Sequence, residues 1–263
     1  MKLTVCEFPD EASRHEAAWR ELVSYLGQRP TDVLVLPEMP FVEWQMFMST
    51  RVDQAQWAAA LSAHDRMIER FPELSAAFVL SSRPIEENGI RLNEAFSWCS
   101  DGGYRGVRRK YYLPDEPDGR ESTWFAAGDA EFKPASLGPL TCGFQICSEL
   151  MFPEHARALG QGGAQLIAAP RATGGHLRWR TASSMAAIVS GCFVASANRR
   201  SFTSDQFAGR SSVMSPNGEL LCETSVDEPY ITIDVDLAEA DRAKSTYPRS
   251  VVIPVNAQAD RRW

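Results

Sequence analysis

Short apolar runs alternate with longer amphipathic stretches along this chain, and the alternation predicts strands connected by helices. Apolar side chains repeat every three or four residues in the regions 11–26, 57–68, 150–159 and 177–189, which predicts helices there. We expect Gly27 to end the first helix and Pro37 to break the second strand. Strands are predicted from runs at residues 3–5, 33–36, 77–82, 137–146, 165–169, 193–197 and 230–235.

Two polar turns predict β-hairpins. Asp101-Gly102-Gly103 separates residues 95–99 from 104–111, and Ser215-Pro216-Asn217-Gly218 separates residues 212–214 from 220–222. The residues after 235 are expected to form an irregular tail. Crossover helices combined with hairpins predict one α/β domain over residues 1–263, with mixed sheets.

Composition narrows the class of protein. The chain has 263 residues, of which 44% are hydrophobic, and its formal net charge is −7. This acidity argues against a broadly basic nucleic-acid surface, so we expect no nucleic-acid partner. Glu7 follows too soon after Met1 for an apolar signal-peptide core, and no apolar run approaches the ~20 residues of a membrane span. We therefore expect a soluble, cytoplasmic protein without a membrane partner.

The cysteines and histidines do not suggest a metal site. Six cysteines are spread through the chain, none of them in a CxxC pair, and the four histidines are far apart. Without a signal peptide, the cysteines are expected to be reduced thiols, most of them packed as small apolar side chains.

Two charged side chains lie at the ends of predicted strands, where ligands of open α/β sheets bind. Glu38 follows an apolar strand and precedes apolar residues, a setting that raises a carboxyl pKa toward that of a general base. A solvated loop glutamate is an equally good interpretation. Strand alternation places Arg109 and Lys110 on opposite faces, so one of them points inward and needs an anionic partner. From these residues alone, an edge strand guarded by charges is the better interpretation.

Cys147 is the most informative position. It lies between a predicted strand and a predicted helix, where the helix dipole favours a thiolate and backbone N–H groups can stabilise an oxyanion. The alternative is another buried thiol, which is our interpretation of Cys142 in the preceding strand.

Taken together, these segments resemble the carbon–nitrogen hydrolase (nitrilase) superfamily in order and rough spacing. Glu121 resembles the additional glutamate of that family, because it precedes an aromatic residue and Gly128. The motifs that carry the resemblance are Leu36-Pro37-Glu38, Arg109-Lys110-Tyr111-Tyr112-Leu113 and Ile146-Cys147-Ser148-Glu149-Leu150-Met151-Phe152-Pro153-Glu154.

The resemblance implies a four-layer αββα sandwich with two mixed sheets. It implies that Cys147 is the nucleophile, Glu38 the general base and Lys110 the stabiliser of the tetrahedral intermediate, with Glu121 in support. Hydrolysis would pass through a cysteine thioester and need neither a metal nor an organic cofactor. Replacing Lys110 by methionine is expected to abolish turnover, and removing its buried charge can raise stability.

The details favour the amidase and carbamoyl-hydrolase branch, acting on a small linear carboxamide or an N-carbamoyl compound. Nitrile-hydrolysing members usually have tryptophan after the cysteine, where this chain has Ser148. The chain departs from common family patterns at Tyr112, which is often histidine, and at Glu149, which is often aspartate. A nitrilase and a non-catalytic scaffold remain the alternatives.

Further residues are candidates for the oxyanion site or the substrate pocket. The resemblance implies that the backbone N–H of Ser148 faces the oxyanion together with Lys110, and Tyr112 is a pocket candidate. Arg171 follows a predicted strand and could bind a substrate carboxylate, whereas Glu149 could favour an amino group. Both could instead pair with each other or with neighbours, which is the more economical interpretation. His176 could line the pocket, and a Cys–His hydrolase using His155 or His176 is a competing hypothesis.

Family members usually dimerise through the helix after the nucleophile and through the C-terminal tail. Here these are residues 150–159 and the apolar segments Tyr247-Pro248 and Val251-Val252-Ile253-Pro254. We therefore expect a homodimer or a larger homo-oligomer.

Overall fold

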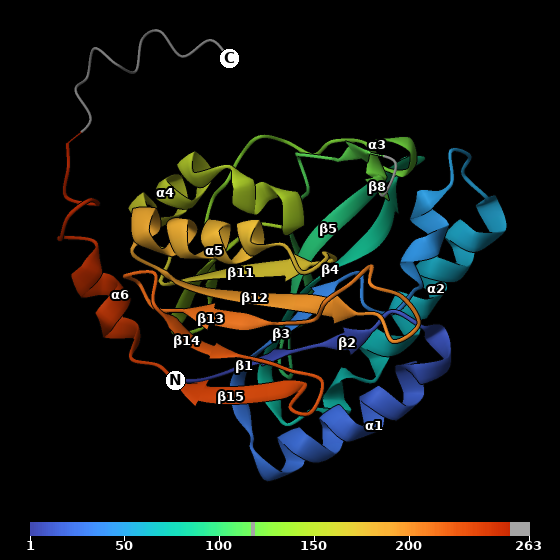
Figure 1. Ribbon diagram of the computed structural model, residues 1–263, viewed down its shortest axis with the longest axis horizontal. Helices are drawn as coiled ribbons and strands as arrows, with labels where there is room; N and C mark the ends of the chain where they lie inside the picture. The colour runs from blue at the N-terminus through green and yellow to red at the C-terminus, as the bar shows by residue number, and fades with distance from the viewer. Residues whose placement is uncertain (117–118, 253–263) are drawn as a thin grey trace, which may run out of the picture.

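The computed structural model describes residues 1–116 and 119–252 as two β-sheets packed face to face, with helices on both outer faces (Figure 1). This four-layer αββα arrangement with mixed sheets confirms the expected fold class. The core between the sheets contains the inward-facing side chains of both, including Val35 and Leu80 from one sheet and Phe144 and Ala168 from the other. The helix-facing side chains form separate clusters on the two outer sides.

The first sheet has the order β15-β1-β3-β4-β5-β6. Its centre, β1-β3-β4, is parallel, and antiparallel strands extend it on both sides. These strands are β1 (Lys2–Cys6), β3 (Thr31–Glu38), β4 (Ala76–Glu87), β5 (Ile90–Cys99), β6 (Gly103–Arg109) and β15 (Tyr230–Asp234).

The second sheet has the order β14-β13-β12-β11-β10-β9, with the short β2 paired to β12. Its parallel centre is β10-β11-β12. The strands are β2 (Phe8–Pro9), β9 (Ala135–Leu137), β10 (Leu140–Phe144), β11 (Leu166–Arg171), β12 (Phe193–Arg200), β13 (Ser212–Met214) and β14 (Leu220–Glu223). A separate two-stranded ribbon is formed by β7 (Asp115–Glu116) and β8 (Gly119–Arg120).

Helices cover the outer faces. In Figure 1, α4 and α5 lie side by side over the second sheet, and α1 lies along the opposite, outer side of the first. The helices are α1 (Ala12–Gln28), α2 (Gln54–Glu69), α3 (Glu121–Trp124), α4 (Pro153–Gln161), α5 (Leu177–Ser190) and α6 (Leu237–Ala243). Short 3₁₀ turns are η1 (Trp44–Met48), η2 (Phe71–Glu73) and η3 (Cys147–Met151).

Four predicted boundaries are wrong for identifiable reasons. Helix α1 runs through Gly27, since glycine only weakens a helix interior. Strand β3 runs through Pro37 to Glu38, because its pairing with β4 becomes irregular between Val35 and Glu38. The run 137–146 is divided by a turn between β9 and β10. The expected irregular tail contains α6, whose first turn is capped by the Asp236 side chain.

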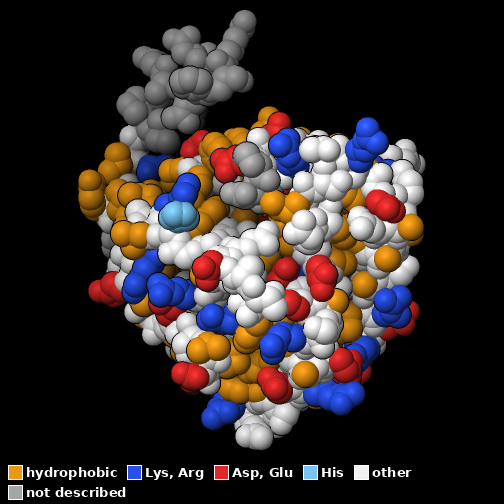
Figure 2. Space-filling model, turned by 45° about the vertical axis from the view of Figure 1, so that its right-hand side comes forward, with side chains coloured by type: hydrophobic (Ala, Val, Ile, Leu, Met, Phe, Trp, Pro, Cys, Tyr) orange, Lys and Arg blue, Asp and Glu red, His pale blue; other side chains and the backbone are white. Residues whose placement is uncertain are grey.

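On the face drawn in Figure 2, acidic and basic side chains are interspersed with small apolar areas. Within the described residues, no helix combines the length and the apolarity that crossing a bilayer requires.

Candidate active site

Four of the predicted site residues meet at the end of the sandwich where the parallel strands terminate. Glu38 is the last residue of β3, Lys110 directly follows β6, and Glu121 begins α3. Cys147 follows β10 and begins η3. The first sheet therefore supplies the glutamate and the lysine, and the second sheet supplies the thiol, as expected for a site at the carboxyl ends of strands.

Lys110 is the centre of this cluster. Its Nζ, which is fully buried, donates to Glu38 Oε1 at 2.8 Å and to the two carboxylate oxygens of Glu121 at 2.8 and 2.7 Å. Burial alone would lower the pKa of Lys110, but the charges of Glu121 and Glu38 outweigh it and raise the pKa, so the ammonium stays protonated. Burial also raises the pKa of Glu121 to about 7, against the lowering effect of Lys110.

Glu38 is held from one side only. Its Oε1 accepts hydrogen bonds from Lys110 and from the side-chain amide of the buried Asn93, at 2.9 Å in the second case. Its Oε2 is buried and has no hydrogen-bond partner among the described residues. An unpartnered carboxylate oxygen beside a thiol can accept a proton, which is the requirement for a general base.

Cys147 lies in a strained backbone conformation, with φ at 50°, where few residues other than glycine are found. Burial raises the pKa of its thiol, and the charge of Glu38 raises it further, whereas Lys110 and a backbone hydrogen bond from Ala172 lower it. The net direction is upward, so the expected thiolate-favouring environment is not what the structure shows. The thiol instead keeps its proton until a base removes it.

A cavity of about 600 Å³ opens onto this cluster, a size suited to a small molecule. Cys147, Ser148 and Glu121 line it, while Glu38 and Lys110 lie fully buried beneath. Its walls are Trp44, Gln45, Met48, Pro114, Glu116, Ala172, Thr173, Gly174, His176, Arg178, Trp179, Asp205, Gln206 and Phe207.

Comparison with known proteins identifies this arrangement. The model of the carbon-nitrogen hydrolase family matches residues 5–245. The chain belongs to this family.

The chain is 26% identical over 255 residues to a Staphylococcus aureus protein described as a hydrolase in the agr operon, covering 94% of this chain and 96% of that protein. It is 29% identical over 168 residues to the N-carbamoylputrescine amidase of Arabidopsis thaliana, covering 63% of this chain and 56% of the relative. The crystal structure of a Helicobacter pylori carbon-nitrogen hydrolase has the same fold, with a TM-score of 0.80 at 21% identity, covering 95% of this chain and 94% of that one. Family and relatives support an amidase-type carbon–nitrogen hydrolase.

Within this carbon–nitrogen hydrolase, Glu149 does not line the cavity. It is fully buried and forms a two-point ion pair with Arg108, with N–O distances of 2.5 and 2.9 Å. It also accepts hydrogen bonds from the backbone N–H groups of Ile146 and Tyr111, at 2.7 and 2.8 Å. The carboxylate thus ties the turn before Cys147 to the segment after Lys110, which supports the interpretation that it pairs with neighbours.

Tyr112 also lies away from the cavity. Its hydroxyl hydrogen-bonds with His155 Nε2 at 2.8 Å, and its ring stacks on Phe152 with centroids 3.7 Å apart. Its carbonyl oxygen accepts a hydrogen bond from Ser148 Oγ at 2.6 Å, so it acts on the site through its backbone. His155 is occupied by this contact and by stacking on Phe132, which disfavours it as the base of a Cys–His pair.

Arg171 and His176 take different places. His176 is exposed, precedes α5 and lines the active-site cavity. Arg171 is buried at the end of β11 and lines a neighbouring cavity, and it does not pair with Glu149.

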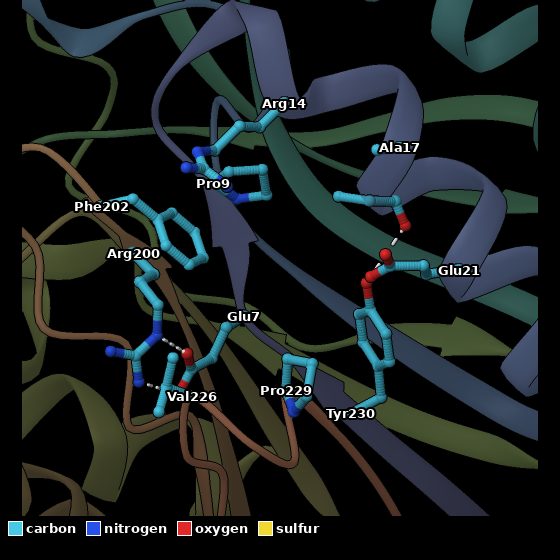
Figure 3. Close-up of a pocket in the computed structure, with 11 residues that line it drawn as sticks. Glu7, Pro9, Arg14, Ala17, Glu21, Arg200, Phe202, Val226, Pro229 and Tyr230 are labelled. Carbon is cyan, nitrogen blue, oxygen red and sulfur yellow. Dashed lines mark hydrogen bonds and ion pairs between the residues drawn. The ribbon is translucent and has the colours of Figure 1, made fainter.

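Another cavity, of about 110 Å³, lies between α1 and the start of β15 and is drawn in Figure 3. Three of its polar side chains are already engaged: Glu7 pairs with Arg200, and the Tyr230 hydroxyl donates to the carbonyl oxygen of Ala18. Arg14 lies over the ring of Phe202, 4.3 Å from its centroid. No cysteine, serine or histidine belongs to its described lining, so we assign no chemistry to it.

Within residues 1–116 and 119–252, no group of three or more histidine, cysteine, aspartate or glutamate side chains could hold a metal ion.

Sequence reasoning missed three contributors to the site. Asn93 lies in the middle of β5, and only the pairing of β3 with β4 and of β4 with β5 brings it near Glu38. Trp44 and Phe207 form an aromatic wall of the cavity from two distant loops, with ring centroids 6.0 Å apart. Aromatic residues in loops carry no sequence signal that separates a pocket wall from a core position.

Proposed function

We propose that this enzyme hydrolyses the C–N bond of a small linear carboxamide or N-carbamoyl compound through a thioester on Cys147. The observation that carries the proposal is the buried, unpartnered Oε2 of Glu38 beside a thiol that is protonated at rest. The carbamoyl alternative is supported by the plant relative named N-carbamoylputrescine amidase.

The reaction begins when Glu38 takes the thiol proton and the sulfur attacks the carbonyl carbon. The electron pair of the C=O bond moves to oxygen, and Lys110 stabilises the resulting negative charge. A donor of this kind is typically worth about 3–4 kcal/mol of barrier. Lys110 is held by two carboxylates, so its position is fixed before substrate arrives.

The tetrahedral intermediate then collapses. The C–N bond breaks, and Glu38 returns its proton to the departing nitrogen, which leaves as ammonia. A water molecule attacks the thioester and gives up a proton to Glu38. The C–S bond breaks, Glu38 returns the proton to sulfur, and the free thiol is regenerated. The product is a carboxylic acid from a carboxamide, or a carbamic acid from an N-carbamoyl compound, which then loses CO₂ to give the amine. Glu121 positions Lys110 and lines the cavity, so it can also contact the substrate or the water.

The decisive experiment is ammonia release from a panel of amides, N-carbamoyl compounds and nitriles. Cys147→Ala should lose all turnover, and the matched Cys222→Ala, at a half-buried thiol outside the cavity, should keep it. Acid-quenched wild-type protein should show an acyl mass on the Cys147 peptide during turnover, and Cys147→Ala should show none. Turnover of nitriles alone would favour the nitrilase alternative, and inactivity across the panel would favour a scaffold.

A homodimer is also proposed. The side chains of Tyr247 and Val252 are 81% and 84% exposed, and Arg157 of α4 donates to the carbonyl oxygen of Val251 at 3.0 Å. Apolar side chains this exposed beside a helix are typical of an interface. Ile253 and Pro254 of the predicted apolar segment lie outside the described residues. A monomer in sedimentation at micromolar concentration would contradict this proposal.

We propose a cytoplasmic location because the cysteine thiols are unpaired. All six cysteines are free, and a reducing compartment keeps them so. Fractionation of the native host would test it.

A further inference from the structure

A cavity of about 120 Å³ lies next to the active-site cavity, where β11 and β14 end and β13 begins beneath the start of α5. We call it the β11–α5 cavity. It shares Gly174, His176 and Trp179 with the active-site cavity. One water molecule needs roughly 10–15 Å³ by this measure, so a carboxylate or phosphate group fits inside.

The buried charge in this cavity is Arg171, whose exposed fraction is 4%. Its guanidinium donates to Ser196 Oγ at 2.5 Å, to Thr173 Oγ1 at 2.7 Å and to the carbonyl oxygen of Arg210 at 3.2 Å. All three acceptors are neutral, and they use three of the five N–H groups of an arginine. No carboxylate of the described residues lies within ion-pair distance of it. Burial lowers the pKa of Arg171 to about 10, and the nearby charges of Cys147 and Glu223 offset only part of that effect.

The start of α5 adds positive potential to the same cavity. The helix has 14 residues, and its cap residue, His176, makes no side-chain hydrogen bond to the first turn. No acidic residue lies in that turn. Backbone N–H groups of the first turn and the helix dipole therefore add positive potential at this end of the cavity, and no acidic side chain of the turn offsets it.

We propose that the β11–α5 cavity binds an anion, a carboxylate or phosphate group held by Arg171 and the first turn of α5. Arg180 and Arg210 also line the cavity and add to the attraction, while Glu223 is the acidic side chain that opposes it. An anion supplies the counter-charge that the fold leaves out. A planar guanidinium with free N–H groups suits a carboxylate or phosphate in particular.

The cavity is next to the Cys147 thiol. Strands β10 and β11 are parallel neighbours, Arg171 ends β11, and Cys147 begins η3 shortly after β10. Cys147 and Arg171 are close enough for the charge of Cys147 to raise the pKa of Arg171. The bound anion is therefore either the distal group of the substrate or a separate small anion next to the site. Only the assignment of the anion to the substrate rests on the proposed hydrolysis. Anion binding in this cavity does not depend on the proposed function.

Calorimetric titration with inorganic phosphate and with succinate, at constant ionic strength, tests binding without any need for turnover. Wild-type protein should bind with saturation. Arg180→Ala, at an exposed position, should weaken binding about tenfold, the loss typical of one charge-assisted hydrogen bond. Glu223→Gln should tighten binding, because it removes the opposing charge. Arg20→Ala, an exposed change on α1, should leave affinity unchanged.

Absence of saturable binding to the wild-type protein would overturn the proposal, and so would equal affinities for wild type, Arg180→Ala and Glu223→Gln. Arg171→Gln should abolish anion binding if the variant folds. If it does not fold, Arg180→Ala and Glu223→Gln still test the proposal.

Enzyme kinetics distinguish the two possible sources of the bound anion. The substrates to compare are a monoamide of a straight-chain dicarboxylic acid and the uncharged amide of equal length. If the substrate supplies the anion, the carboxylated amide is preferred, Arg180→Ala reduces that preference about tenfold, and phosphate raises KM. If a separate anion binds, phosphate binds while KM stays constant. Both results support the anion site.

Discussion

Replacing Lys110 by methionine tests the central ion cluster most directly. The change leaves the carboxylates of Glu38 and Glu121 buried side by side without their shared cation. At separations of 2.7–2.8 Å and an effective dielectric constant of about 20, each lost attraction is roughly 6 kcal/mol before desolvation is counted. After desolvation, breaking a buried pair typically costs about 3–5 kcal/mol. This reverses the expectation from sequence that removing the lysine charge can stabilise the fold.

Protonation limits the penalty and makes it depend on pH. A buried carboxyl with an ordinary pKa of 4.5 escapes its charge by taking a proton, at a cost of about 1.4 kcal/mol for each unit of pH above that value. The stability lost per carboxyl therefore cannot exceed about 5 kcal/mol near pH 8 and about 1.4 kcal/mol near pH 5.5. Because a raised carboxyl pKa makes the folded state bind protons more tightly, stability falls as pH rises through the window above 4.5.

The assay is thermal and urea unfolding of wild-type and variant protein near pH 8 and pH 5.5. We expect the variant to melt about 6–20 °C lower at the higher pH and to recover most of that difference at the lower pH. Lys110→Met/Glu121→Gln should recover part of the loss near pH 8. Lys133→Met, at an exposed ion pair, is the control and should change little. Equal stability of wild type and Lys110→Met near pH 8, or a gap that does not narrow in acid, would refute the reasoning.

Three further predictions follow from the same contacts. Glu38→Gln should lower kcat about 10²–10⁴-fold with little change in melting temperature, since Lys110 keeps its other carboxylate; a large loss of stability would contradict this. Asn93→Leu should lower kcat/KM about 10–100-fold, because its amide holds Glu38 Oε1 in place; unchanged kcat/KM would count against it. Glu149→Gln should cost about 3–5 kcal/mol in urea unfolding by leaving Arg108 buried without a full counter-charge, and wild-type stability would show that the pair is not needed.

Local patterns made Glu38 and Cys147 candidates, because each follows an apolar run. From the residues alone, Lys110 was better interpreted as part of a guarded edge strand, and the family resemblance gave all three their roles. The structure brings them together with Glu121. The resemblance to a known family supplied the layers, which no local pattern specifies.

The remaining contacts depend on register and on packing between sheets. Asn93 reaches Glu38 across β4, because Glu38 is opposite Ser82 after an irregularity in the β3–β4 pairing and Asn93 is opposite Pro84 in the β4–β5 pairing; no local pattern encodes that register. Arg108 and Glu149 meet across 41 residues and two sheets. The raised pKa of Cys147 likewise follows from burial beside Glu38, which a helix-terminus argument does not contain.

Because Glu38 and Lys110 come from one sheet and Cys147 from the other, the proposed mechanism depends on the alignment of two independently hydrogen-bonded sheets. The ladder of either sheet can stay intact while the distance between them changes by an ångström, a misplacement that can cost about 10²-fold in rate. The apolar side chains between the sheets, such as Val35 and Phe144, therefore set the spacing of the reacting atoms as well as the stability of the fold. The turnover rate therefore depends on the distance between the two sheets. Substitutions in the core far from the cavity can abolish activity while every strand stays folded.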